Sequence, residues 1–218
     1  EASSSSSITL VSATLHVRRL FLAILSISFF WAMGAVLAAQ FPPLVKNVFY
    51  ADQSVATLFL AVFSIGVAIG SVAINRMLRG QVSARYAPAS ALLMGVFVLI
   101  LYWLTRDWPS SAELVDIHEF LRHPLGWAVV LDLLGVAIAG GMFLVPLYAF
   151  LTTTVPKSET ARTVAANNIV NSGAMVVATL MLTGLVLLGV SVAETLFLVA
   201  IASIVSAWLG YKLHLACD

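Results

Sequence analysis

The hydropathy of the chain changes abruptly along Gly70-Ser71-Val72-Ala73-Ile74-Asn75-Arg76-Met77-Leu78-Arg79-Gly80. An apolar segment that carries glycine ends here in a short basic loop, and another apolar run begins a few residues later. Over the whole chain, 61% of the 218 residues are hydrophobic and 10% are charged, and the mean hydropathy is +1.03. This composition leaves too little polar surface to cover a soluble globule of this size. We therefore expect the chain to lie in a lipid bilayer.

Apolar runs of membrane-spanning length recur six times along the chain. A bilayer core about 30 Å thick needs roughly 20 apolar residues in a helix. The runs lack the strict alternation of barrel strands, and a helix satisfies its own backbone groups inside lipid. We predict an all-α integral membrane fold with six transmembrane helices, at about 20–41, 55–75, 87–104, 126–151, 163–189 and 192–213.

Lysine and arginine are unevenly divided between the two sides of these spans. Of the 11, three lie on one side, and eight lie on the side that carries both termini: Arg18, Arg19, Arg76, Arg79, Arg85, Lys157, Arg162 and Lys212. Because cytoplasmic loops are enriched in these residues, both termini are expected in the cytoplasm. Residues 1–17, with a run of serines, are predicted to be a linker or disordered tail, and 215–218 a second tail. The single cysteine, Cys217, excludes a disulfide framework within the chain.

The longest connector, residues 105–125, has apolar residues at helical spacing. Leu114, Ile117 and Leu121 recur among charged residues, with Pro109 and Pro124 on either side. The pattern indicates either a small amphipathic helix on the outer membrane surface or a solvated connector.

Polar residues are unequally shared among the predicted spans. Spans 87–104 and 192–213 contain few polar groups, whereas the other four carry Gln40, Ser64, Asp132, Asn167, Asn168 and Asn171. We expect the two apolar spans to be peripheral and the other four to face a cavity or a partner. This division splits the domain into two triplets of helices.

Asp132 is the one carboxylate well inside a predicted span. At a rise of about 1.5 Å per residue it lies on the order of 9 Å deep, where an unpaired charge costs roughly 2.5–3.5 kcal/mol. It could bind a coupling cation or an ammonium head group, or it could be a neutral, hydrogen-bonded or interface-facing carboxyl.

Asn167 and Asn171 have the i, i+4 spacing of one helix face, and Asn168 lies one position round. Their amides could hold a phosphate, a hydroxyl or a carbonyl, or could bond a neighbouring helix. Lys46, after Pro42 and Pro43, could meet a lipid phosphate at an outer entrance, or could simply snorkel to the interface.

The loop stretch resembles a signature of the major facilitator superfamily. In Gly70–Gly80, Arg76 and Gly80 match the cytoplasmic-loop motif of those transporters, while Asn75 stands where an aspartate is usual. The resemblance implies the C-terminal six-helix half of such a transporter, with Asn75, Arg76 and Gly80 in gating. The N-terminal six-helix half would then be a partner, and the chain is expected to be a fragment.

Four stretches are similar to the bacterial lysophospholipid transporter branch: 30–36 around Trp31, Gln40-Phe41-Pro42-Pro43, 140–149 around Pro146, and 167–171. That branch moves lysophospholipids, notably lysophosphatidylethanolamine, across the bacterial inner membrane beside, or fused to, an acyltransferase. The resemblance makes a lysophospholipid the expected substrate and an acyltransferase an expected partner. Together with the polar pattern it makes Asp132, Asn167, Asn168, Asn171, Gln40 and Lys46 the candidate substrate-binding residues.

Two other functions remain open at this point. The same fold could export drugs or metabolites, or it could be a non-transporting membrane anchor for a fused acyltransferase. No phosphate-binding loop, metal-ligand spacing or nucleophile–base set occurs in the sequence. We therefore expect no enzyme activity, no metal, no cofactor and no nucleic-acid partner.

Overall fold

The computed structural model describes residues 18–106, 108–111 and 113–217, and within them it is an all-α membrane protein. The helices are α2 (Arg18–Pro43), the π-helical η1 (Leu44–Val48), α3 (Gln53–Met77), α4 (Ala87–Arg106), α5 (Ile117–Arg122), α6 (Gly126–Thr153), α7 (Lys157–Leu187) and α8 (Val192–Cys217). Six of them are long and apolar enough to cross a membrane, as the sequence predicts. The predicted tail 1–17 lies outside the described residues.

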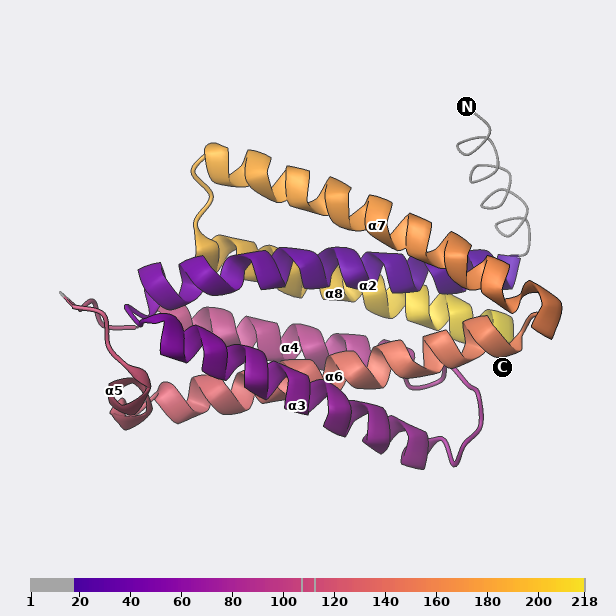
Figure 1. Ribbon diagram of the computed structural model, residues 1–218, viewed down its shortest axis with the longest axis horizontal. Coiled ribbons are helices and arrows are strands. Elements are labelled where there is room, and N and C mark those ends of the chain that lie inside the picture. The colour runs from indigo at the N-terminus through magenta and orange to yellow at the C-terminus, as the bar shows by residue number, and fades with distance from the viewer. Residues whose placement is uncertain (1–17, 107, 112, 218) are drawn as a thin grey trace.

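Four helices form the middle of the bundle, and two lie outside it. α2, α4, α6 and α8 pack around one another, while α3 packs on α6 and α7 packs on α2, at opposite sides (Figure 1). The spans 87–104 and 192–213, expected to lie away from a cavity or partner, are α4 and α8, which pack closely on each other within this bundle. Their place relative to a cavity or partner stays a prediction. The outer helices are α3 and α7, whose polar residues suggested a face toward a cavity or partner.

The packing pattern repeats between the two triplets of spans. The helices α2, α3 and α4 of the first triplet correspond in order to α6, α7 and α8 of the second. Under this correspondence, the packing of α3 on α6 matches that of α7 on α2. The packing of α4 on α6 likewise matches that of α8 on α2. The pairs α4 with α8 and α2 with α6 each correspond to themselves. Figure 1 shows the matching geometry, since α3 and α7 each lean away from the bundle toward their C-terminal ends. Such nested triplets are typical of transporter folds.

Glycines allow α3 and α6 to approach each other closely. A Cβ added at Gly66 would lie 2.5 Å from the Ala137 Cβ, and one at Gly70 would collide with the backbone of Ile138. Gly141 on α6 meets the Val67 carbonyl in the same way. The glycine spacing of α3 therefore has a packing role, as close helix contacts in membranes commonly require.

An aromatic cluster closes the end of the bundle opposite the start of α2 and the end of α8. Phe49, Phe59, Trp108 and Phe120 lie with ring centroids 4.7–5.9 Å apart, and Trp108 stacks on Phe120. Because Phe120 is on α5, this cluster attaches the connector between α4 and α6 to the spans. The connector also pairs with the α2–α3 loop, since the Val115 N–H donates to the Tyr50 carbonyl at 2.8 Å.

Several helix boundaries differ from the sequence expectations; the first span, for example, continues through η1 to Val48 rather than ending at 41. α5 has only six residues and leaves out Leu114, because Asp116 caps it by accepting from the Glu119 N–H. α7 begins at Lys157 rather than 163, so its first turns are polar. α8 continues to Cys217, so residues 215–217 of the expected tail are helical.

Candidate functional site

Four polar side chains form a connected cluster between α2, α6 and α7. The Ser28 hydroxyl donates to Asn171 Oδ1 at 2.6 Å, and Asn171 Nδ2 donates to the Tyr148 hydroxyl at 3.4 Å. Trp31 Nε1 also donates to the Tyr148 hydroxyl, at 3.0 Å. Ser28 and Asn171 are buried, whereas Trp31 and Tyr148 are half-buried. These four residues, called the polar cluster below, link three helices and have one partly accessible edge.

Asn167 extends the polar cluster by one helical turn along α7. It is fully buried, and neither its Nδ2 nor its Oδ1 has a hydrogen-bond partner among the described residues. A buried amide without partners costs roughly 1–3 kcal/mol, so it is uncommon in a purely structural position. Asn168, the next residue, is exposed on the outer side of α7. The structure thus brings Asn167 and Asn171 together and leaves Asn168 apart.

Asp132 lies in apolar surroundings nearer the opposite end of the bundle. Its side chain is 5% exposed, and neither carboxyl oxygen has a hydrogen-bond partner among the described residues. Val129, Leu133 and Val136 on the same helix belong to the apolar core. Asp132 is therefore a buried carboxyl that no described group stabilises, and it is separate from the polar cluster.

The remaining candidate residues lie at the ends of the bundle. Gln40 is buried near the end of α2, while Lys46 is exposed on η1. Asn75 and Arg76 are exposed at the end of α3, where the Asn75 carbonyl accepts from the Gly80 N–H at 3.2 Å. After the last helical residue, Met77, the backbone is left-handed at Arg79 (φ +51°) and at Gly80 (φ +74°), and this turn ends α3. Asn75, Arg76 and Gly80, the residues predicted to act in gating, lie in a tight turn, and Arg76 makes no ion pair among the described residues.

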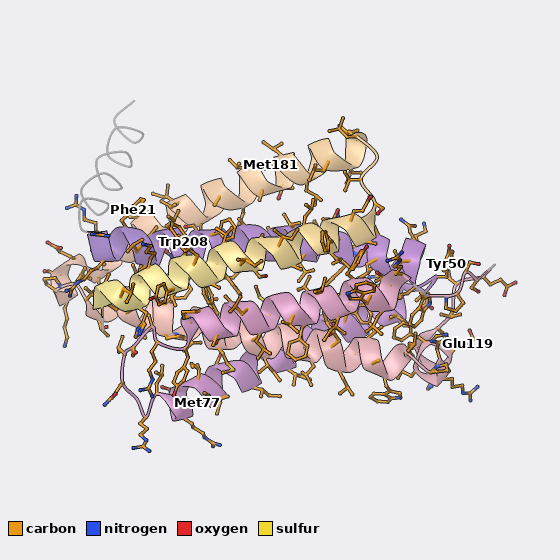
Figure 2. The ribbon with its side chains drawn as sticks, turned by 180° about the vertical axis from the view of Figure 1, so that it is seen from behind. Phe21, Tyr50, Met77, Glu119, Met181 and Trp208 are labelled. Carbon is orange, nitrogen blue, oxygen red and sulfur yellow. The ribbon has the colours of Figure 1, made fainter. Side chains whose placement is uncertain are left out.

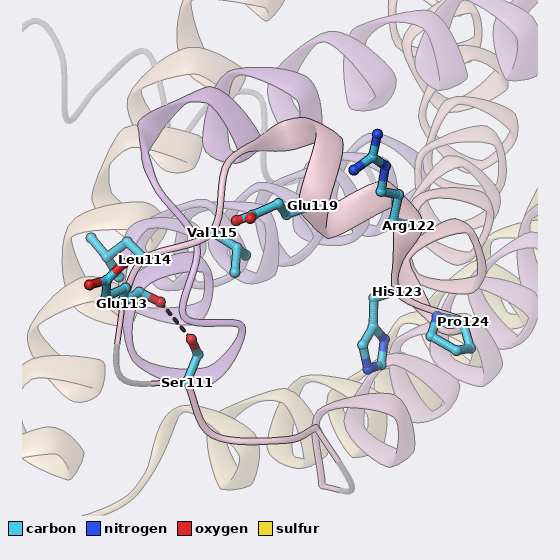
Figure 3. Close-up of a pocket in the computed structure, with 8 residues that line it drawn as sticks. All are labelled: Ser111, Glu113, Leu114, Val115, Glu119, Arg122, His123 and Pro124. Atoms are coloured by element: carbon cyan, nitrogen blue, oxygen red, sulfur yellow. Dashed lines mark hydrogen bonds between the residues drawn. The ribbon is translucent and has the colours of Figure 1, made fainter.

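The connector between α4 and α6 borders an open hollow of about 610 Å³ (Figure 3). Glu113, Glu119, Arg122 and His123 line it, and Ser111 donates to the Glu113 carbonyl at 2.7 Å. The hollow carries both signs of charge and opens at the end of the bundle, away from the polar cluster.

Sequence reasoning did not identify Ser28, Trp31 or Tyr148 as polar partners. Trp31 and Tyr148 were noticed only as parts of longer motifs. Tryptophan and tyrosine are enriched at the membrane interface, so the position of Trp31 midway along α2 is itself a signal that its polar atom needs a partner. Tyr148, five residues before the end of α6, gives no such signal.

Comparison of the chain with protein-family models, curated proteins and solved structures gives no match in any of the three. The case for a function therefore rests on the sequence and on the geometry described above.

Proposed function

We propose that this chain is one six-helix half of a major facilitator transporter that moves lysophospholipids across the bacterial cytoplasmic membrane by alternating access. The polar cluster with the adjoining Asn167 is the observation that carries the proposal. Polar side chains are costly inside a bilayer and usually face a substrate path or a partner helix. Here they gather where α2, α6 and α7 meet, and one edge stays accessible.

The exposed apolar surface of the outer helices α3 and α7 favours a partner half and an amphiphilic substrate. Apolar residues are exposed along α3 and the second half of α7, including Ile65, Ile69 and Leu180. Figure 2 shows Met181, which is 65% exposed, on the outer side of α7. A second six-helix half would cover part of this surface, and an acyl chain could lie against it while the polar cluster binds an uncharged polar group of the lipid.

The proposal is tested by uptake into lipid vesicles. The native protein that contains this chain is reconstituted, and lysophosphatidylethanolamine is added outside. An amine reagent that cannot cross the membrane then measures how much lipid remains accessible. We expect faster protection than in protein-free vesicles, and a large loss of this activity in Asn171→Leu. Thr179→Leu, at an exposed position on the same helix, should behave as wild type.

Unfolding should not explain a loss in Asn171→Leu. Interhelical hydrogen bonds in membranes contribute about 0.6 kcal/mol on average, so losing two of them leaves the bundle folded. Uptake no faster than in protein-free vesicles would contradict the proposal. Competition by hydrophobic dyes would favour a drug exporter. Reacylation of lysolipid in detergent without any uptake would favour a membrane anchor for an acyltransferase.

A further inference from the structure

The hydroxyl of Tyr148 receives two hydrogen bonds and donates none among the described residues. Trp31 Nε1 and Asn171 Nδ2 both donate to its oxygen, at 3.0 and 3.4 Å. A phenol oxygen accepts at its lone pairs and has one hydrogen to donate. With both incoming bonds in place, the Tyr148 hydrogen is available to an acceptor that the chain does not supply. A partly buried tyrosine usually finds such an acceptor.

Open space lies beside the polar cluster. Gly34 is three residues after Trp31 on α2, so the two share a helix face. A Cβ added at Gly34 would have no atom within 4 Å, whereas one at Gly140, across on α6, would contact Phe30 at 3.3 Å. A ligand group can therefore approach α2 next to Trp31 without displacing a side chain.

The charges around the cluster favour a neutral acceptor. α2 has no lysine or arginine between Arg19 and Lys46, α6 has none, and α7 has none after Arg162. Arg19 is nine residues before Ser28 and Arg162 is nine residues before Asn171, which is about 14 Å along each helix. A phosphate at Tyr148 would lack a cation from these helices. A carbonyl oxygen needs only a donor, because it cannot donate in return.

We propose that Tyr148 is a substrate-binding residue, positioned by Trp31 and Asn171, that donates its hydroxyl hydrogen to the ester carbonyl of the acyl chain of a lysophospholipid. This inference rests on the proposed function and assigns the part of the lipid that this half recognises. The phosphate would be held elsewhere.

The test compares two substrates that differ only at the proposed acceptor. Uptake of an ester-linked lysophosphatidylethanolamine is measured beside its ether-linked analogue, which has the same head group, glycerol hydroxyl and chain length but no carbonyl. In Tyr148→Phe we expect the half-saturating concentration of the ester to rise about three- to ten-fold, which corresponds to one hydrogen bond. The value for the ether analogue should stay unchanged. Tyr211→Phe, at an exposed tyrosine on α8, is the matched control.

Each other outcome counts against the inference. An equal loss for both lipids would make Tyr148 a purely structural member of the cluster, and no loss for either would remove it from the binding site. If wild-type protein takes up neither lipid, the proposed function fails and the inference fails with it. Should Tyr148→Phe be poorly folded, Trp31→Phe keeps the Tyr148 hydroxyl and removes one positioning bond. It should show a smaller loss that is still confined to the ester.

Discussion

Asp132 is deeply buried and has no hydrogen-bond partner among the described residues, so its removal should stabilise the protein. Neither carboxyl oxygen is hydrogen-bonded to a described residue, and the surrounding side chains are apolar. Burying a polar group without a partner costs about 1–3 kcal/mol by mutational data. We expect Asp132→Val to raise the free energy of unfolding by about 1–2 kcal/mol and to reduce lysolipid uptake, since stability is often exchanged for activity at functional sites.

Thermal unfolding in detergent measures the first effect, and vesicle uptake measures the second. Asp132→Asn keeps the size and polarity of the side chain and should leave stability near that of wild type. A less stable Asp132→Val protein would show that the carboxyl has a structural partner. Undiminished uptake in both variants would remove Asp132 from the candidate substrate-binding residues.

Asp52 is a helix cap outside the spans, and its contribution should depend on pH. Its carboxylate accepts from the Ser54 side chain and from the Ser54 N–H at 2.8 Å, which lowers the pKa of Asp52 below its ordinary value of 3.8. Because the folded pKa is lower than the unfolded one, the stabilisation is present above pH 3.8 and is lost as the pH falls through the folded value.

The difference in Tm between wild type and Asp52→Ala should therefore be largest near neutral pH and should shrink below about pH 4. Thermal scans of both proteins between pH 7 and pH 3 measure it. Glu113→Ala, at an exposed position, should show no comparable trend. A Tm difference that stays constant with pH would mean that the Asp52 charge does not contribute to the cap.

At the level of helices, the contact between α3 and α6 should be the least tolerant of added volume. A methyl group at Gly70 would meet the Ile138 backbone, which cannot move aside as a side chain can. We expect Gly70→Ala to lower the free energy of unfolding by about 1–3 kcal/mol, the usual cost of overpacking. Gly173→Ala on α7 meets nothing within 4 Å and should be neutral or mildly stabilising. Equal thermal stability of the two variants would contradict this packing.

The spans were predictable because each depends on a long local signal, whereas several boundaries depend on contacts. Hydropathy identified all six membrane helices. It missed the polar first turns of α7, because these are helical without being apolar. Leu114 was expected on the connector helix, but it is 51% exposed, and Phe120 provides the buried contact instead. Packing between distant segments determines which connector residue is buried, and the spacing of apolar residues alone does not predict it.

The candidate site was predictable only in part, for a similar reason. Buried polar residues such as Asp132, Asn167 and Asn171 stand out in an apolar sequence, and the structure places all three inside the bundle. Their grouping does not stand out, since Ser28 and Asn171 are 143 residues apart in sequence. The division into a polar cluster and a separate carboxyl appears only when α2, α6 and α7 are assembled.

For the whole molecule, the arrangement of the ends predicts a definite orientation in the membrane. The start of α2, the end of α8 and the loops after α3 and α6 lie at one end, with eight of the 11 lysines and arginines, and the connector that carries α5 lies at the other (Figure 1). By the positive-inside rule, the first end should face the cytoplasm.

Cysteine labelling tests this orientation. Cys217 is replaced by serine, and a single cysteine is placed at Leu114 or at Gln81, which are both exposed and lie at opposite ends. In intact cells a maleimide that cannot cross the membrane should label position 114 at once and position 81 only after permeabilisation. The reverse pattern would invert the topology, and it would then place Lys46 on the cytoplasmic side, where it could not meet lipid entering from the outer leaflet.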